Sequence, residues 1–234
     1  MTGVRNAIVA CCAAFLLGGC EGASITDSVR GLMGTSPDEK VDMAFDESDP
    51  DRRREGIYEL SGEDWGLQGD YLEAYALMLK SDKDPYVRVA AARALGKAGD
   101  AKYRPALVEA LDDPSPAVRT AAARSLDSVP GDEAVQPLQK ALAHDESADV
   151  RMWSARALRH YRSEGVLASL IEALDDTAFS VAHNARQSLK DITGRDLGGA
   201  RADWAGQGAE DLLDETPREP KKRSLWRRVF GGGD

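Results

Sequence analysis

The sequence predicts an all-α solenoid of about five helical hairpins, because one short pattern recurs along most of the chain. The pattern is a valine–arginine pair with a leucine eight residues after the valine, and consecutive copies begin 35, 31, 32 and 31 residues apart. A second amphipathic segment precedes each later copy. A period of roughly 20–50 residues is typical of stacked helical repeats, in which no repeat buries its own apolar face. Each repeat is therefore expected to contain two antiparallel helices, called A and B.

The B helices are predicted from the valine–arginine pair, which is taken as positions 0 and 1. The pairs are Arg52-Arg53, Val87-Arg88, Val118-Arg119, Val150-Arg151 and Val181-Ala182, the first and last being degenerate. Positions 0, 4 and 8 share one helical stripe. Position 8 holds Leu60, Leu95, Leu126, Leu158 and Leu189, and position 4 holds Gly56, Ala91, Ala122, Ser154 and Ala185. Small residues at position 4 would let neighbouring helices approach closely.

The A helices are predicted from the apolar segments between these copies. They are Tyr71–Lys80, Pro105–Leu111, Pro137–Leu142 and Val166–Leu174. Helix starts are indicated by aspartate followed by proline, since aspartate is a good N-cap and proline fits the first helical position. The three such pairs are Asp49-Pro50, Asp84-Pro85 and Asp113-Pro114.

The first residues have the pattern of an export signal. One positive charge, Arg5, precedes an apolar run that is too short to span a bilayer comfortably. The run ends in Leu17-Gly18-Gly19-Cys20, which resembles the lipobox of bacterial lipoproteins. The resemblance implies cleavage after residue 19 and a lipid on Cys20; an ordinary signal peptide is the alternative. Glu21 then favours the outer membrane, and residues 20–44, rich in Gly, Ser, Thr and Asp, are expected to form a flexible tether.

The repeat motif itself resembles a known family. The segment DPYVRVAAARALG is similar to the HEAT repeats of the subclass shared with phycobilin lyase subunits, and the similarity covers residues 45–193. Together with the lipobox, it makes the chain resemble a bacterial HEAT-repeat lipoprotein. The resemblance implies a right-handed superhelical α-solenoid of about five HEAT-like helical hairpins.

The same resemblance implies a structural ladder of aspartate and arginine that runs from repeat to repeat. Its expected pairs are six residues apart: Asp82 with Arg88, Asp113 with Arg119, and Asp145 with Arg151, extended by Glu47 with Arg53. In the last repeat Asp176 faces Ala182, so the ladder is expected to stop there. Position 1 lies about 100° from the anchor on the helix, which points the arginine at the next repeat.

The residues after the repeats are expected to close the solenoid and then to leave it. The ending TGRDLGGARADW resembles the termini of bacterial HEAT arrays, which makes Trp204 the expected plug within a cap and linker at 194–216. Residues 217–234 form a basic tail whose segment PREPKKRSLWRRVF carries six basic residues and one acid. This segment is either an amphipathic membrane contact, a disordered solubilising tail or a segment that docks on the acidic body.

No catalytic or metal site is predicted. The three cysteines all lie in the first 20 residues, and the three histidines form no recognisable motif. There is no Walker or Rossmann glycine loop. Acidic pairs in the turns could suggest calcium, but none has EF-hand spacing. We therefore expect no enzyme activity, no cofactor, no metal and no small-molecule substrate. The net charge is −10, or −11 without residues 1–19, which argues against nucleic acid as a partner.

What remains is the B-helix face opposite the buried stripe, at positions 2 and 6. Position 6 holds Arg93, Arg124, Arg156 and Gln187, and position 2 holds Val89, Thr120, Met152 and His183, with Trp153 close by. Three arginines in register would suit an acidic or planar group of a partner, although a merely solvated face is the alternative.

The sequence thus predicts a non-catalytic protein-binding scaffold or adaptor. It would be lipid-anchored through Cys20 and face the periplasm of a bacterial cell envelope. Its expected partners are proteins and the membrane, which it would contact through the lipid and, in the amphipathic interpretation of the tail, through residues 217–234. The alternative is an accessory subunit of an envelope enzyme or modification complex.

Overall fold

The computed structural model describes residues 35–213 and shows helices and turns only in that range. The chain divides into two compact units, Met1–Lys40 and Val41–Asp234. Described residues of the first unit form the start of α3 (Pro37–Ala44). The signal peptide, Cys20, most of the predicted tether and the basic tail lie outside the described residues.

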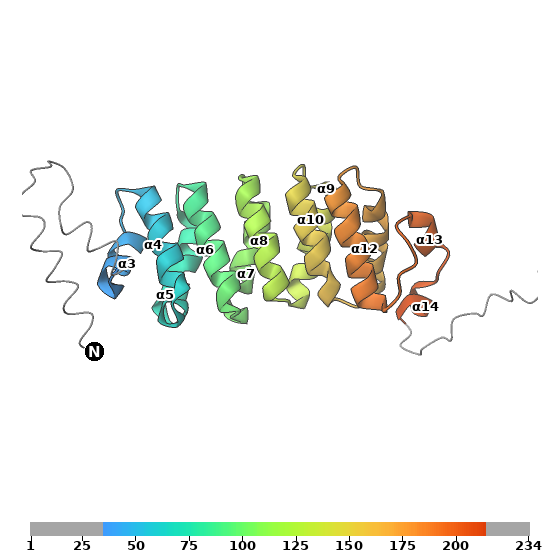
Figure 1. Cartoon of the computed structure of the whole chain (residues 1–234), viewed down its shortest axis with the longest axis horizontal. Coiled ribbons are helices and arrows are strands. Elements are labelled where there is room, and N and C mark those ends of the chain that lie inside the picture. Colours follow the sequence, from blue (N-terminus) through green and yellow to red (C-terminus); the bar gives the residue numbers. More distant parts are fainter. Residues whose placement is uncertain (1–34, 214–234) are drawn as a thin grey trace, which may run out of the picture. The chain divides into compact units, whose positions relative to one another are not determined.

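The second unit contains the repeats, and its helices follow one another in chain order (Figure 1). The B helices are α4 (Pro50–Gly62), α6 (Pro85–Ala98), α8 (Pro116–Ser128), α10 (Ala148–Ala157) and α12 (Phe179–Thr193). The A helices are α5 (Asp70–Ser81), α7 (Arg104–Glu109), α9 (Val135–His144) and α11 (Glu164–Glu172), and short 3-10 turns extend several of them. Neighbouring B helices pack directly on each other, whereas successive A helices touch less. The predicted all-α solenoid is confirmed.

The core follows the predicted stripe of the B helices. All five position 8 leucines are buried, as are the four valines that stand at position 0. The small residues between them allow the close approach: Ser125 Oγ on α8 donates a hydrogen bond to the Ala92 carbonyl on α6 at 2.8 Å, and Ser188 on α12 does the same to Ala155 on α10. A Cβ on Gly96 would collide with Ser125. Bulk at this seam would therefore separate neighbouring repeats.

Two local predictions differ from the structure. Residues 37–44, expected within a flexible tether, form helix α3. Met43 and Ala44 at its end are buried, because Gly56 on α4 has no side chain to keep their backbone away. Asp49 and Asp84 do cap α4 and α6, but Asp113 does not cap α8. That helix begins two residues later than expected, at Pro116, because the Asp113 carboxylate is held by an arginine of the preceding repeat.

The end of the repeat stack is covered by two short helices, α13 (Arg201–Ala205) and α14 (Ala209–Leu213). Trp204 is fully buried, and its indole Nε1 donates a hydrogen bond to the Gly198 carbonyl at 2.9 Å. Leu212 is buried beside the same repeat. The structure thus places Trp204 where a plug of the apolar end would lie. No helix within residues 35–213 has both the length and the apolar content to cross a membrane.

Candidate functional site

An arginine–aspartate ladder joins consecutive repeats. Each arginine at position 1 of a B helix binds, through Nε and Nη2, both carboxylate oxygens of the aspartate in the following repeat. The pairs are Arg53–Asp82, Arg88–Asp113, Arg119–Asp145 and Arg151–Asp176, with donor–acceptor distances of 2.7 to 3.2 Å. Bidentate pairs of this kind fix both distance and orientation.

The ladder partners differ from the predicted ones by one repeat. Arg119 Nη1 donates a hydrogen bond to the backbone carbonyl of Asp113, its expected partner, at 3.0 Å, but the Nε and Nη2 of Arg119 bind the carboxylate of Asp145. The Asp113 carboxylate is already occupied by Arg88. Because of the same shift, Asp176 binds Arg151 and is the last member of the ladder, whereas the sequence analysis expected Asp176 to have no arginine partner.

At the first repeat, the predicted pair of Glu47 with Arg53 is also wrong. Arg53 Nη1 instead donates to the Asp46 carbonyl at 2.7 Å, and its Nε and Nη2 bind Asp82. Asp46 therefore stands where Asp82 and Asp113 stand in the later repeats, contributing a carbonyl to the arginine of its own repeat.

The ladder is charged and largely shielded from water. Burial by itself would raise the pKa of Asp145. The hydrogen bonds from Arg119 and from the Ser147 amide together lower this pKa by more than burial raises it, so the net shift is downward. The hydrogen bond from Arg151 lowers the pKa of Asp176 in the same way. Each of these side chains is about one-tenth exposed. Charged groups so placed need their partners, which gives the ladder a structural role.

A second row of inter-repeat ion pairs was not predicted. It joins Lys80 to Glu109, Lys102 to Glu73, Lys140 to Asp112, and Arg104 to Glu133. The sequence did contain a signal for these pairs, because their opposite charges are separated by 28 or 29 residues, which is close to the repeat period. These pairs are mostly exposed, so each contributes little to stability.

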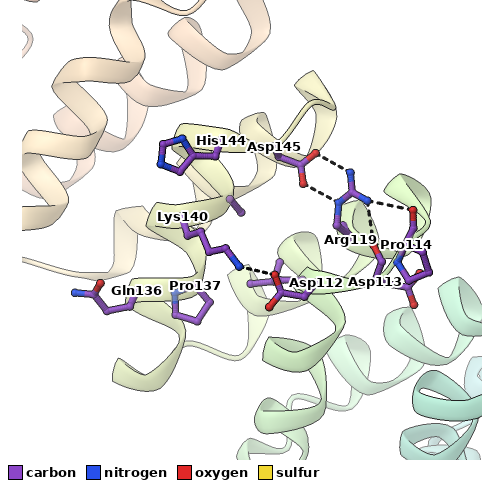
Figure 2. Close-up of a pocket in the computed structure, with 11 residues that line it drawn as sticks. Asp112, Asp113, Pro114, Arg119, Gln136, Pro137, Lys140, His144 and Asp145 are labelled. Atoms are coloured by element: carbon purple, nitrogen blue, oxygen red, sulfur yellow. Dashed lines mark hydrogen bonds and ion pairs between the residues drawn. The ribbon is translucent and has the colours of Figure 1, made fainter.

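A hollow with a volume of about 680 Å³ lies between the third and fourth repeats (Figure 2). Its charged walls are mutually paired: Arg119 with Asp145, and Lys140 with Asp112 at 2.7 Å. His144 lies at its rim. The lining of this hollow contains no serine, threonine or cysteine, and the described residues contain no cluster of three or more metal-binding side chains.

The predicted B-helix face exists, but its members differ in their surroundings. Arg93, Arg124, Arg156, Gln187 and His183 are exposed, whereas Thr120, Met152 and Trp153 are half-buried. Val89, expected on this face, is instead buried, because its short apolar side chain joins the core cluster. Arg93 donates to the Tyr58 hydroxyl at 3.3 Å, and Tyr58 is position 6 of the first repeat.

The face is most organised around Trp153. The guanidinium carbons of Arg124 and Arg156 lie 5.0 and 5.1 Å from the centre of its indole ring, within the range of cation–π contacts. Arg156 also pairs with Asp127 at 3.2 Å. We call these four residues, with Arg159 and His160, the tryptophan cluster.

Asp127 gathers the rest of the tryptophan cluster. It binds Arg159 at 3.1 Å and His160 at 2.9 Å in addition to Arg156. The sequence analysis did not single out Asp127, Arg159 or His160. Asp127 and Arg159 occupy position 9 of their repeats, and His160 occupies position 10. Their only signal was an acid in one repeat and a base in the next at position 9.

A model of HEAT repeats matches residues 72–159 and 130–190, together just over half of the chain. The chain belongs to the HEAT-repeat family. No curated protein matches it at a significant level.

Solved structures with similar folds include the CpcE–CpcF complex of phycocyanin lyase from Nostoc sp. PCC7120. That match has a TM-score of 0.60 and 20% identity, and covers 77% of this chain and 70% of that one. An engineered protein matches with a TM-score of 0.54 and 24% identity over 68% and 82% of the two chains. A designed armadillo repeat protein in complex with the peptide (KR)4 matches with a TM-score of 0.52 and 18% identity, and the match covers 80% of this chain and 94% of that one. At these identities the likeness shows a shared fold.

The ladder predicts a pH-dependent loss of stability in the variant Asp145→Asn. At pH 7 we expect a loss of about 2–4 kcal/mol, because Arg119 loses its charged partner. Since the pKa of Asp145 is lower in the folded chain than in the unfolded one, the pair contributes above about pH 4 and is lost as the pH falls through the folded-state value. Urea unfolding should therefore show that wild type and variant differ less in their free energy of unfolding at pH 3 than at pH 7.

The matched control is Asp112→Asn, which breaks the exposed pair with Lys140. It should cost less than about 1 kcal/mol at either pH. If Asp145→Asn lowers the free energy of unfolding by the same amount at both pH values, the charged Arg119–Asp145 pair is not the source of the loss.

Proposed function

We propose that the chain is a non-catalytic protein-binding scaffold whose B-helix face receives its partner. The observation that supports this is the tryptophan cluster, where two exposed arginines are stacked on one half-buried indole. Tryptophan and arginine are enriched among residues that dominate binding energy at protein interfaces. The charged groups of the hollow in Figure 2 are by contrast paired with each other.

We further propose that the scaffold works at a bacterial cell envelope, facing the periplasm. Its support is the sequence Leu17-Gly18-Gly19-Cys20 after an apolar segment, in which Cys20 would carry the lipid. Glu21 favours the outer membrane. The acidic net charge of −10 argues against nucleic acid as the partner. The basic segment 217–230 would supply a second, electrostatic contact with an anionic membrane.

A second candidate function is that of an accessory subunit in an envelope enzyme or modification complex. The likeness to the fold found in the CpcE–CpcF complex of phycocyanin lyase favours it. The two functions are separable by experiment. A scaffold retains its partner through purification, whereas an accessory subunit changes a rate in a reconstituted reaction.

The scaffold function is tested by changing Arg93, Arg124 and Arg156 together to glutamate. In-cell cross-linking and affinity recovery from the detergent-solubilised envelope should recover a partner with the wild type and lose it with the variant, because the cationic face becomes anionic. Circular dichroism checks that the variant is folded. Equal recovery with both proteins would exclude this face as the binding site.

The anchor is tested by the variant Cys20→Ser. Radiolabelled fatty acid should enter the wild type and be absent from the variant, since serine has no thiol to receive the lipid. The variant should also move from the membrane fraction toward the soluble fraction. Absence of label from the wild type would contradict lipid anchoring and leave an ordinary signal peptide.

A further inference from the structure

The arginines at position 6 are not equivalent, and the difference identifies an anchor. Arg156 is already held by Asp127 at 3.2 Å. Within the described part of the chain, the polar partner of Arg93 is the Tyr58 hydroxyl and the contact of the Arg124 guanidinium is the Trp153 ring. No carboxylate among residues 35–213 forms an ion pair with Arg124. A guanidinium without an acid is notable in a chain with 40 acidic and 30 basic residues.

Arg124 is also held in place before any ligand arrives. Its guanidinium carbon lies 5.0 Å from the Trp153 ring centre, and the indole is itself half-buried against the core. Restricting a long side chain in the bound geometry removes part of the entropy cost of binding. The planar group keeps its N–H donors at its edge, which is the geometry that binds a carboxylate through two hydrogen bonds.

The members of the tryptophan cluster carry positive charge in excess, with three arginines against one aspartate. Both guanidinium carbons lie within 5.1 Å of one ring centre, so Arg124 and Arg156 are at most about 10 Å apart. Asp127 offers one negative charge to the three arginines of the tryptophan cluster. It also shows how the cluster receives an acid, since two guanidiniums and an imidazole converge on one carboxylate. A second carboxylate would complement the remaining charge.

We infer that the tryptophan cluster, with Arg124 as its free anchor, binds an acidic peptide segment of the partner protein. The inference rests on the proposed function, to which it adds the chemistry of the ligand. An aspartate or glutamate of the segment pairs with Arg124 over Trp153, and neighbouring acids lie toward Arg156 and, one repeat away, toward Arg93. The pairing is salt-dependent because these groups are exposed.

The test uses a fluorescein-labelled oligoglutamate of about eight residues. Extended, it reaches roughly 26 Å, which crosses neighbouring B helices whose axes are about 8–10 Å apart. Fluorescence anisotropy with the purified full-length chain at about 50 mM salt should show binding that weakens as salt is raised. Arg124→Gln should weaken it about tenfold or more, because a charge-assisted bidentate contact is lost.

The matched control is Arg201→Gln, which removes the same charge from an exposed arginine of the cap helix. The basic tail at 217–230 is identical in both variants, so any binding there cancels in the comparison. Arg124→Lys keeps the charge but loses the planar stack, and should fall between wild type and Arg124→Gln.

Equal affinities for Arg124→Gln and Arg201→Gln would overturn the inference. So would tighter binding of an oligothymidine of similar length that Arg124→Gln weakens and Arg201→Gln does not, which would assign the cluster to nucleic acid. The proposed function is tested separately from this inference. If oligoglutamate binding does not depend on Arg124 but the triple glutamate variant still loses its envelope partner, the scaffold function is supported and only the acidic ligand is wrong.

Discussion

The structure depends on one interaction, the bidentate pair between an arginine of one repeat and an aspartate of the next. A single helical hairpin here is too small to bury its own apolar stripe, so stability must come from neighbours. Packing of apolar side chains is not directional. The ladder supplies direction, because a guanidinium that binds two carboxylate oxygens accepts only one arrangement of the two repeats.

Each ladder aspartate also shapes the turn in which it lies. The carboxylate of Asp145 accepts the Ser147 amide at 2.8 Å while it binds Arg119. That amide belongs to the N-cap of α10, so the same side chain joins the repeats and fixes the start of a B helix. The small residues at the seam then set how closely the helices pack.

Register between repeats is what creates the candidate binding face. Arg124 lies on α8 and Trp153 on α10, so their contact exists only while these two helices keep their relative position. Asp127 and Arg159 likewise belong to neighbouring repeats. A structural ladder and a binding surface are thus coupled through the same pair of helices.

Much of this fold could be predicted from the sequence, because the period and the apolar stripe report directly on burial. The ladder residues could be recognised, but their partners could not. Asp113 is close to Arg119 along the chain, and only the packed structure shows that its carboxylate belongs to Arg88. Helix α3 was missed because its sequence is polar, and its burial depends on Gly56 in another helix. The tryptophan cluster could be predicted only in part, since Asp127, Arg159 and His160 do not recur in other repeats.

The most direct test of this account is a pair of double-mutant cycles on Arg119, measured by urea unfolding at pH 7. One cycle combines Arg119→Gln with Asp145→Asn, the carboxylate of the next repeat; the other combines it with Asp113→Asn, the aspartate of its own repeat. The account predicts a coupling energy of about 1–3 kcal/mol in the first cycle and much less in the second. Equal couplings, or a larger one with Asp113, would show that each repeat is held by its own pair and would contradict the inter-repeat ladder.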